Sequence, residues 1–237
     1  MDLWGKYMAR LLVLTGGDEF DPSCAETDLF ALNFTETRQK LILILPTAAE
    51  YEPSGEKAFI NAKRYFEKLG FKSDCLDLYR RTQANDPSQS DKLKLATHLY
   101  IIGGNPVYLL QTLKDTIFID KVWNWLTEGN VLFGSSAGAM VLGTYMRNPI
   151  DKTWLAGLGM ISEMAVLPHH ENCDPNLISR EIISAGLENV IVLGIDARTS
   201  CVGTGSSWRV MGPGTVTVYN KQNWKVFRSG EHITDVG

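Results

Sequence analysis

A serine set among small residues is the first feature of this sequence that suggests chemistry. Ser136 lies within GSSAG, residues 134–138, between two apolar runs. This G-x-S-x-G pattern is typical of a nucleophile elbow, a tight turn between a strand and a helix that exposes a serine hydroxyl for attack on a carbonyl carbon. Small residues also occur where a chain merely turns a corner, so the interpretation needs a base and an oxyanion hole elsewhere in the sequence.

Histidine is the usual base for a nucleophilic serine, and the chain contains four. His98 begins an expected strand and His232 lies in the C-terminal tail, where structural or exposed roles are the simpler interpretation. His169 and His170 lie together in VLPHHEN, directly after an apolar segment. Adjacent histidines also suggest a metal site, but no Asp, Glu or His cluster at ligand spacing accompanies them, so we expect no metal. One of these two is the expected base.

These candidates need a scaffold that brings distant segments together. Continuous apolar runs alternate with amphipathic stretches, which predicts a doubly wound α/β fold with a mostly parallel sheet. Strands are expected at residues 10–15, 40–45, 71–76, 98–102 and 131–133, and helices at 54–69, 106–113, 122–127, 137–145 and 177–187. The carboxyl ends of such strands form one binding edge. We therefore expect Ser136 to meet Gly16-Gly17, Pro46-Thr47 and Gly103-Gly104 at that edge.

The pattern changes after about residue 188, where short β segments follow at 190–195, 200–203, 207–211, 215–219 and 224–227. Turns rich in Gly, Pro and Asn separate them, which indicates antiparallel ribbons. Because these segments lack an apparent core of their own, we predict a single domain over residues 1–237. Within it, residues 206–237 are expected to form a C-terminal β extension and residues 1–8 a peripheral N-terminal extension.

Composition limits the classes of protein to consider. The chain of 237 residues is 44% hydrophobic and 21% charged, as in ordinary globular proteins. A net charge of −4 argues against a general nucleic-acid binder. The apolar runs are too short to cross a bilayer, the start lacks a signal-peptide pattern, and the four scattered cysteines indicate reduced thiols. We expect a cytoplasmic monomer or homodimer without nucleic-acid or membrane partners.

The motifs LTGG, ILPTAA, YIIGGNPVYLLQTL, GSSAGAM and LPHHEN, in this order, resemble those of the peptidase E and cyanophycinase family of serine peptidases, over residues 10 to about 205. The resemblance implies a fold similar to class I glutamine amidotransferases, with serine in place of cysteine at the elbow. It also implies hydrolysis of a peptide bond next to an acidic residue, without a metal or organic cofactor.

The resemblance also implies roles for single residues. The proline-histidine pair of the family matches Pro168-His169, which favours His169 as the base. Its glycine-rich segment matches Gly103-Gly104-Asn105. This implies an oxyanion hole formed by backbone N–H groups at Gly104 and Ala137, with Asn105 beside the substrate.

The acid that would orient the histidine stays open. The family places a glutamate at a position that matches Ala197, and Asp196 is its neighbour. Asp196 ranks first because a strand end holds a carboxylate rigidly, although successive side chains of an extended segment point in opposite directions. Asp151 matches a second acidic position of the dipeptidases, and Glu171 is a third possibility.

The sequence thus predicts a serine hydrolase of short peptides, above all dipeptides with an N-terminal aspartate. Arg180 approximately matches an arginine of the dipeptidases and is the candidate to hold the substrate carboxylate. Pairing of Arg180 with Glu181 or Asp174 is an equally good interpretation. Two alternatives are a cyanophycinase-like enzyme, which would require an acidic pocket for arginine, and a non-catalytic binding protein on the same fold.

Overall fold

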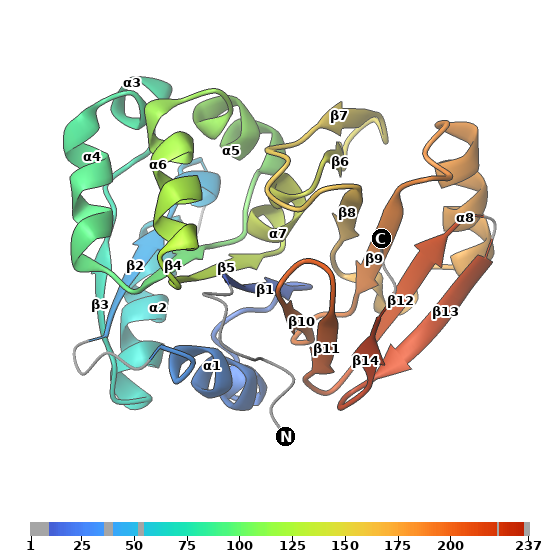
Figure 1. Ribbon diagram of the computed structural model, residues 1–237, viewed down its shortest axis with the longest axis horizontal. Coiled ribbons are helices and arrows are strands. Elements are labelled where there is room, and N and C mark those ends of the chain that lie inside the picture. Colours follow the sequence, from blue (N-terminus) through green and yellow to red (C-terminus); the bar gives the residue numbers. More distant parts are fainter. Residues whose placement is uncertain (1–9, 36–39, 52–54, 222, 235–237) are drawn as a thin grey trace.

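The protein is described by a computed structural model that covers residues 10–35, 40–51, 55–221 and 223–234 (Figure 1). Five strands form the parallel part of its large sheet: β1 (Leu11–Thr15), β2 (Leu41–Leu45), β3 (Lys72–Cys75), β4 (His98–Ile101) and β5 (Val131–Ser135). Three more continue the sheet antiparallel beyond β1: β10 (Ser200–Gly203), β11 (Trp208–Met211) and β14 (His232–Ile233). The order β14-β11-β10-β1-β5-β4-β2-β3 confirms the predicted α/β fold with a mostly parallel sheet.

Helices cover both faces of this sheet (Figure 1). On one face lie α1 (Ala25–Leu32) and α2 (Gly55–Lys68), and on the other α5 (Pro106–Leu113), α6 (Ile117–Thr127) and α7 (Ala137–Leu142). Successive side chains of a strand point to opposite faces, so Leu11 and Val13 enter one core while Leu12 and Leu14 enter the other. Burial on both faces is why these strands are continuous apolar runs. Two short helices, α3 (Arg81–Ala84) and α4 (Pro87–Asp91), occupy the polar segment before β4.

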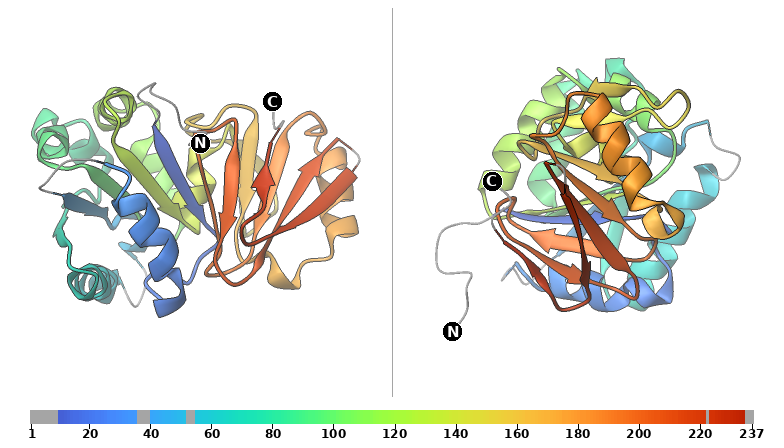
Figure 2. Two further views of the ribbon diagram at one scale, coloured as in Figure 1. Left: turned by 60° about the horizontal axis from the view of Figure 1, so that its bottom comes forward. Right: turned by 90° about the vertical axis from the view of Figure 1, so that its right-hand side faces the viewer.

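A second sheet lies beside the first (Figure 2). It has the order β13-β12-β9-β8 and consists of β8 (Met164–Leu167), β9 (Ile191–Ile195), β12 (Thr215–Asn220) and β13 (Asn223–Arg228). Ile182 of α8 (Pro175–Ser184) packs on it in a small cluster with Ala165, Val192 and Tyr219. The buried side chains of the late β segments are divided between this cluster and the large core of the parallel sheet, which includes Leu193, Trp208 and Val216. The single domain over residues 1–237 stays a prediction. The expected extension at residues 1–8 lies outside the described residues.

The helix after the elbow is shorter than predicted. It ends at Leu142, and the chain continues into a hairpin of β6 (Tyr145–Arg147) and β7 (Trp154–Ala156). Gly143 comes so close to β8 that a Cβ there would lie 2.6 Å from the Met164 carbonyl oxygen. The next N–H, of Thr144, donates to that same oxygen at 2.8 Å. This tertiary pairing ends the helix, although the sequence stays apolar.

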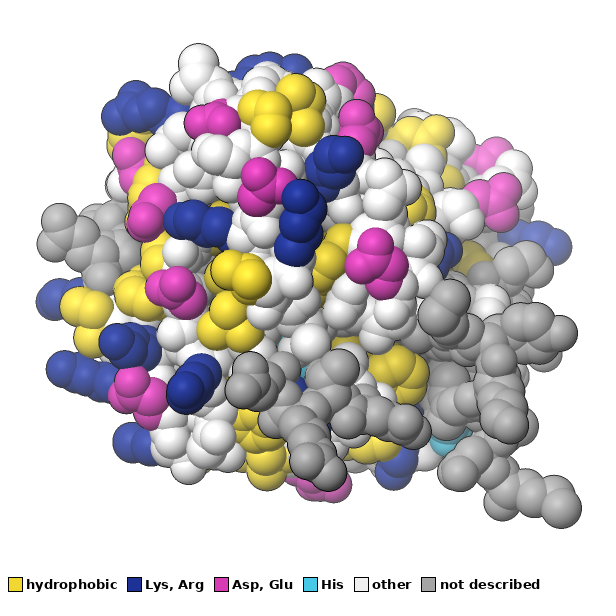
Figure 3. Space-filling view, turned by 60° about the vertical axis from the view of Figure 1, so that its left-hand side comes forward, with side chains coloured by type: hydrophobic (Ala, Val, Ile, Leu, Met, Phe, Trp, Pro, Cys, Tyr) yellow, Lys and Arg dark blue, Asp and Glu magenta, His cyan; other side chains and the backbone are white. Residues whose placement is uncertain are grey.

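The described part of the chain contains no helix that is both long and apolar enough to cross a membrane. On the face shown in Figure 3, Lys and Arg side chains are interspersed with Asp and Glu, and hydrophobic side chains form only small groups.

Candidate active site

Ser136 lies in the strand-to-helix turn that a nucleophile elbow requires. It follows β5, immediately precedes α7, and has φ 48° and ψ −112°. A non-glycine residue rarely adopts such a conformation, and strain of this kind is concentrated at functional sites. The neighbours must be small, because a Cβ on Gly134 would lie 2.7 Å from the Gly138 carbonyl oxygen and one on Gly138 would lie 2.2 Å from that of Ile101.

His169 is the histidine that reaches this serine. Its Nε2 lies 3.3 Å from Ser136 Oγ, within hydrogen-bonding distance. The residue has a left-handed backbone with φ 51° and ψ 47°, and its N–H donates to the Gly16 carbonyl at 2.8 Å. The elbow after β5, the loop after β1 and the loop after β8 thus converge, as expected of segments at the carboxyl edge of the sheets.

His170 has a different environment. Its side chain is buried, its Nε2 lies 2.7 Å from the Tyr219 hydroxyl, and its ring lies against Gly194. Burial lowers the pKa of His170, which favours the neutral imidazole. This histidine therefore connects the loop to the second sheet and leaves His169 as the candidate base.

Backbone donors are available beside the serine. Among the described residues, neither the Gly104 N–H nor the Ala137 N–H donates to another group. Gly104 has φ +136°, and a Cβ there would lie 2.2 Å from the Ala48 carbonyl oxygen, so the loop approaches too closely for a side chain. Asn105 caps α5, where its Oδ1 accepts from the Tyr108 N–H at 3.0 Å. The structure thus brings the expected oxyanion donors to the same edge as Ser136.

The two acids ranked first from the sequence are engaged elsewhere. Asp196 Oδ2 accepts from the N–H and the Oγ1 of Thr215, at 2.8 and 2.9 Å, at the start of β12. Asp151 lies in the exposed turn of the β6–β7 hairpin, where its Oδ1 accepts from the N–H and hydroxyl of Thr153. These hydrogen bonds give both carboxylates local structural partners, and neither is directed to His169.

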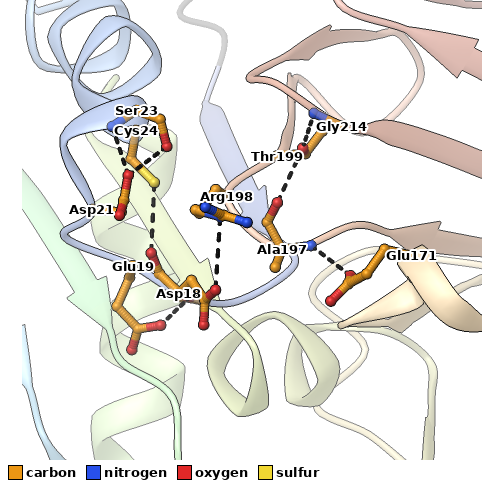
Figure 4. Close-up of polar contacts among 11 residues, drawn as sticks. Asp18, Glu19, Asp21, Ser23, Cys24, Glu171, Ala197, Arg198, Thr199 and Gly214 are labelled. Carbon is orange, nitrogen blue, oxygen red and sulfur yellow. Dashed lines mark hydrogen bonds and ion pairs between the residues drawn. The ribbon is translucent and has the colours of Figure 1, made fainter.

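Of the three candidate acids, Glu171 is the one whose pKa is lowered in part by the charge of His169. It lies in a short 3-10 helix, His170–Asn172, and its Oε2 accepts from the Ala197 N–H at 2.9 Å (Figure 4). Partial burial acts to raise the pKa of Glu171, but the Ala197 hydrogen bond and the charges of His169 and Arg198 outweigh it and lower that pKa. Its side chain is exposed, and no direct hydrogen bond to His169 is formed.

A cavity of about 220 Å³ opens beside Ser136 and His169. Its walls include Ser136, His169, Leu167 and Arg147. Arg147, at the end of β6, forms a two-point ion pair with Glu181 of α8 through Nε and Nη2. Arg180 lies on α8 with an exposed side chain and is not among the lining residues. Of these two arginines, Arg147 is therefore the one that faces the cavity, and the sequence analysis did not identify it.

Glu19 is a further residue at this edge that the sequence analysis did not identify. Its carboxylate accepts from the Gly103 N–H at 2.8 Å and from Ser135 Oγ at 2.7 Å. The available signal was its position, two residues after the Gly16-Gly17 pair that was expected at the active edge.

No group of three or more His, Cys, Asp or Glu side chains is arranged to hold a metal ion within the residues that the structure covers. The polar groups around Ser136 are instead a hydroxyl, an imidazole and backbone N–H groups, which are the components of covalent acyl transfer.

Comparisons with known proteins agree with this geometry. Residues 11–211 match the model of peptidase family S51. A cyanophycinase from Nostoc sp. (strain PCC 7120) is 30% identical over 194 residues, which are 75% of this chain and 62% of that protein. A peptidase E from the same organism is 24% identical over 207 residues, which are 84% of this chain and 80% of that protein. The chain therefore spans less than two thirds of the length of the first of these relatives.

Solved structures show the same relationship. The crystal structure of a peptidase from an acI-B1 Actinobacterium superposes with a TM-score of 0.83 and 28% identity, and covers 96% of this chain and 98% of that one. A putative peptidase E from Listeria monocytogenes EGD-e, at 21% identity and a TM-score of 0.63, shares the fold over 87% of this chain and 100% of its own. The family match covers most of the chain and includes Ser136 and His169, so this protein belongs to peptidase family S51.

Proposed function

We propose that this protein is a serine peptidase that hydrolyses short peptides, with Ser136 as nucleophile and His169 as base. The observation that carries the proposal is the 3.3 Å approach of His169 Nε2 to Ser136 Oγ, on an elbow with φ 48° and ψ −112° at the serine. A strained serine within reach of an imidazole, next to unused N–H groups, is the arrangement that activates a hydroxyl for acyl transfer.

The chemistry follows from these positions. Ser136 Oγ attacks the scissile carbonyl carbon while its proton passes to His169 Nε2, and the carbonyl π electrons move onto oxygen. The N–H groups of Gly104 and Ala137 stabilise that oxyanion, each by roughly 3 kcal/mol in the transition state. When the C–N bond breaks, the amine leaves with the proton from His169. A water molecule then attacks the acyl carbon while His169 Nε2 takes one of its protons. When the bond between the acyl carbon and Ser136 Oγ breaks, His169 returns that proton to Ser136 Oγ and the acid product leaves.

Glu171 is the acid that we assign to this site, in place of Asp196 or Asp151. A carboxylate near the imidazole favours the tautomer with a proton on Nδ1 and stabilises the imidazolium that forms during attack. The charge of His169 contributes to the lowered pKa of Glu171, and the Ala197 N–H holds the carboxylate on that side of the loop. Because the Glu171 side chain is exposed, we propose that it acts on Nδ1 through its charge or through bridging water.

The substrate class follows from the cavity. Arg147 lines it, whereas none of the described lining residues carries a carboxylate. The guanidinium presents five N–H donors, of which Glu181 takes two, so others stay available for a substrate carboxylate. We therefore propose peptides with an N-terminal aspartate as substrates, with Arg147 rather than Arg180 as the recognising cation.

A cyanophycinase-like activity is the second candidate, because relatives of that name are 30% identical to this chain. An arginine-bearing substrate would need a carboxylate in the cavity, where the structure has Arg147. This charge favours the acidic substrate over the arginine-bearing one.

Two measurements test the proposed function. Labelling with a fluorophosphonate should modify Ser136 of the wild-type protein and fail in Ser136→Ala, which separates a peptidase from a binding protein on the same fold. Hydrolysis of Asp-Leu, Ala-Leu, an isoaspartyl dipeptide and cyanophycin should then be compared side by side. Preference for Asp-Leu supports the assignment of substrate, preference for cyanophycin supports the second candidate, and wild-type turnover in Ser136→Ala excludes the mechanism.

A further inference from the structure

Glu19 connects the loop after β4 to the end of β5, directly before the proposed nucleophile. Its Oε1 accepts from the N–H of Gly103, the residue before the proposed oxyanion donor Gly104. Its Oε2 accepts from Oγ of Ser135, the residue before the nucleophile. The two sites are close, because a Cβ on Gly103 would lie 3.1 Å from Glu19 Oε1 and 3.2 Å from Ser136 Cβ. One side chain thus ties the loop after β4 to the elbow after β5.

The loop that carries Glu19 is held in an unfavourable backbone conformation. Its neighbours Asp18 and Phe20 have φ of 54° and 69°, and a bulky residue at positive φ is rare. Such a conformation persists only where the surroundings fix it. Asp18 pairs with Arg198 at 3.7 Å on one side of the loop, while Glu19 points to the other side (Figure 4). The Phe20 ring packs against Tyr65, Phe66 and Tyr100, with centroids 5.6, 5.8 and 5.2 Å away.

The two partners, as they are arranged here, are well suited to a carboxylate. Both the Gly103 N–H and the Ser135 hydroxyl act as donors, so the group between them must accept at both ends. A carboxylate only accepts, whereas an amide presents one acceptor and one donor. Hydrogen bonds to an ionised acceptor are also shorter and stronger than neutral ones. Because Ser135 is fully buried, its hydroxyl has no access to bulk water as an alternative.

We propose that Glu19 is a positioning residue that sets the geometry of the oxyanion hole. Glu19 binds the residue before Gly104 and the residue before Ser136, so its carboxylate fixes the position of the Gly104 N–H relative to the elbow that carries the Ala137 N–H. Gly103 and Gly104 have no side chains to hold this loop, and glycine has little conformational preference of its own. The Asn105 N–H holds the far end of this loop by donating to the Ala48 carbonyl at 2.8 Å. Without the carboxylate, the Gly103 N–H loses its acceptor, and the Gly104 N–H shifts relative to the developing oxyanion. This inference rests on the proposed function.

The test compares Glu19→Ala and Glu19→Gln with the wild-type enzyme on a dipeptide that the wild type hydrolyses. Active sites are first counted by fluorophosphonate titration, so that kcat is expressed per reactive Ser136. The second readout is the dissociation constant of a peptide aldehyde, whose adduct with serine bears an oxyanion. Complete loss of an oxyanion donor costs about 100-fold to 1,000-fold in kcat, so a displaced donor should cost about 10-fold to 100-fold.

For Glu19→Ala we expect kcat per site and aldehyde affinity to fall together by such a factor, with KM changed less than about threefold. Glu19→Gln, which keeps one acceptor for the Gly103 N–H, should lose less. Asp21→Asn is the matched control, since this acid of the same loop accepts only from the N–H and hydroxyl of Ser23 and should keep wild-type kcat.

The outcomes separate this inference from the proposed function. Unchanged kcat per titrated site and unchanged aldehyde affinity in Glu19→Ala overturn the role of Glu19, even if fewer molecules are folded. If Glu19→Ala does not fold, Glu19→Gln and Ser135→Ala decide by the same two readouts. A wild-type protein that neither reacts with the fluorophosphonate nor hydrolyses any peptide contradicts the proposed function itself.

Discussion

The imidazole of His169 lies against the backbone of Gly17, where a Cβ would stand 2.2 Å from Cε1 and 2.4 Å from Nε2 of the ring. The neighbouring Gly16 carbonyl accepts from the His169 N–H at 2.8 Å, so the two loops meet along their backbones. The absence of a side chain at Gly17 is therefore what allows the imidazole to reach Ser136.

Gly17→Ala should consequently displace His169 and reduce kcat by about 100-fold or more, because the general base would lose its reach to the nucleophile. Gly70→Ala is a matched control: Gly70 also has a positive φ, of +86°, but no atom lies within 4 Å of the position that a Cβ would take there. Both variants should lose about 1 kcal/mol or more of stability through backbone strain. Steady-state kinetics and thermal melts distinguish them, and equal activities would show that the contact with His169 is unimportant.

Strain at Ser136 leads to a second prediction, about stability rather than rate. Its φ of 48° and ψ of −112° suit glycine, and strained positions cost on the order of 1–3 kcal/mol. Ser136→Gly should therefore be inactive and yet as stable as the wild type, or more stable by about 1 kcal/mol. Ser136→Ala, equally inactive, keeps the strain and should not gain stability. Urea denaturation compares the three proteins, and a less stable Ser136→Gly variant would contradict the idea that the elbow stores strain.

The positive charge of Arg147 in the cavity predicts a preference for acidic substrates. Arg147→Met should raise KM for Asp-Leu by about 10-fold to 100-fold while it changes hydrolysis of a neutral dipeptide much less, because one charge-assisted contact is lost. Arg180→Met, on the exposed side of α8, should leave both substrates unaffected. Glu181→Gln controls for the loss of the ion pair itself. Equal effects of Arg147→Met on acidic and neutral dipeptides would exclude Arg147 as the recognising group.

Stability should also depend on pH through His98, which is buried in β4. Burial lowers the pKa of His98 to about 4 in the folded protein, while the unfolded chain titrates near 6.5. Between these values the unfolded state binds more protons, so the free energy of unfolding falls as pH drops through this window, by up to about 3 kcal/mol.

Urea denaturation of the wild type and His98→Phe at about pH 7.5, 5.5 and 4.5 measures this effect. Asp28, whose pKa burial raises to about 7, acts in the opposite direction but is common to both proteins. The difference between the two curves should therefore report His98 alone. Curves that run parallel over this range would contradict the buried, neutral state of the histidine.

The parallel strands and the elbow could be predicted from the sequence because their causes are local. Strands buried on both faces are continuous apolar runs, and the G-x-S-x-G pattern follows directly on such a run. Chain order then indicated which residues share the carboxyl edge of the sheet. Ser136 was found in this way, whereas the residues alone left His169 and His170 open as the base and the family resemblance favoured His169. The structure places Nε2 of His169 3.3 Å from Ser136 Oγ.

The features that were missed depend on contacts between distant segments. The helix of residues 137–145 was predicted too long because nothing in the local sequence indicates the pairing of Thr144 with Met164. The loop that carries Glu19 has positive φ at Asp18 and Phe20, and a phenylalanine gives no signal of such a conformation in the sequence. The partner of Asp196 was missed for the same reason, since Thr215 lies 19 residues further along the chain.

The identity of the acid gives the last prediction. Glu171→Gln keeps the size of the side chain but removes the negative charge that stabilises the imidazolium of His169. We expect kcat to fall by about 10-fold to 100-fold, less than for an acid in direct contact, where the loss is about 10,000-fold. Asp196→Asn and Asp151→Asn should stay within a few-fold of the wild type, because those carboxylates accept from Thr215 and Thr153.

A relocation experiment tests the same assignment in the opposite direction. The Ala197 N–H donates to the Glu171 carboxylate. The side chain of a glutamate at position 197 would therefore begin next to the place that the Glu171 carboxylate occupies. The double variant Glu171→Ala/Ala197→Glu should therefore recover much of the kcat that Glu171→Ala loses, and should restore the lower limb of the pH–rate profile. If Glu171→Gln hydrolyses peptides at the wild-type rate, or if Asp196→Asn alone is slowed by orders of magnitude, the assignment of Glu171 is wrong.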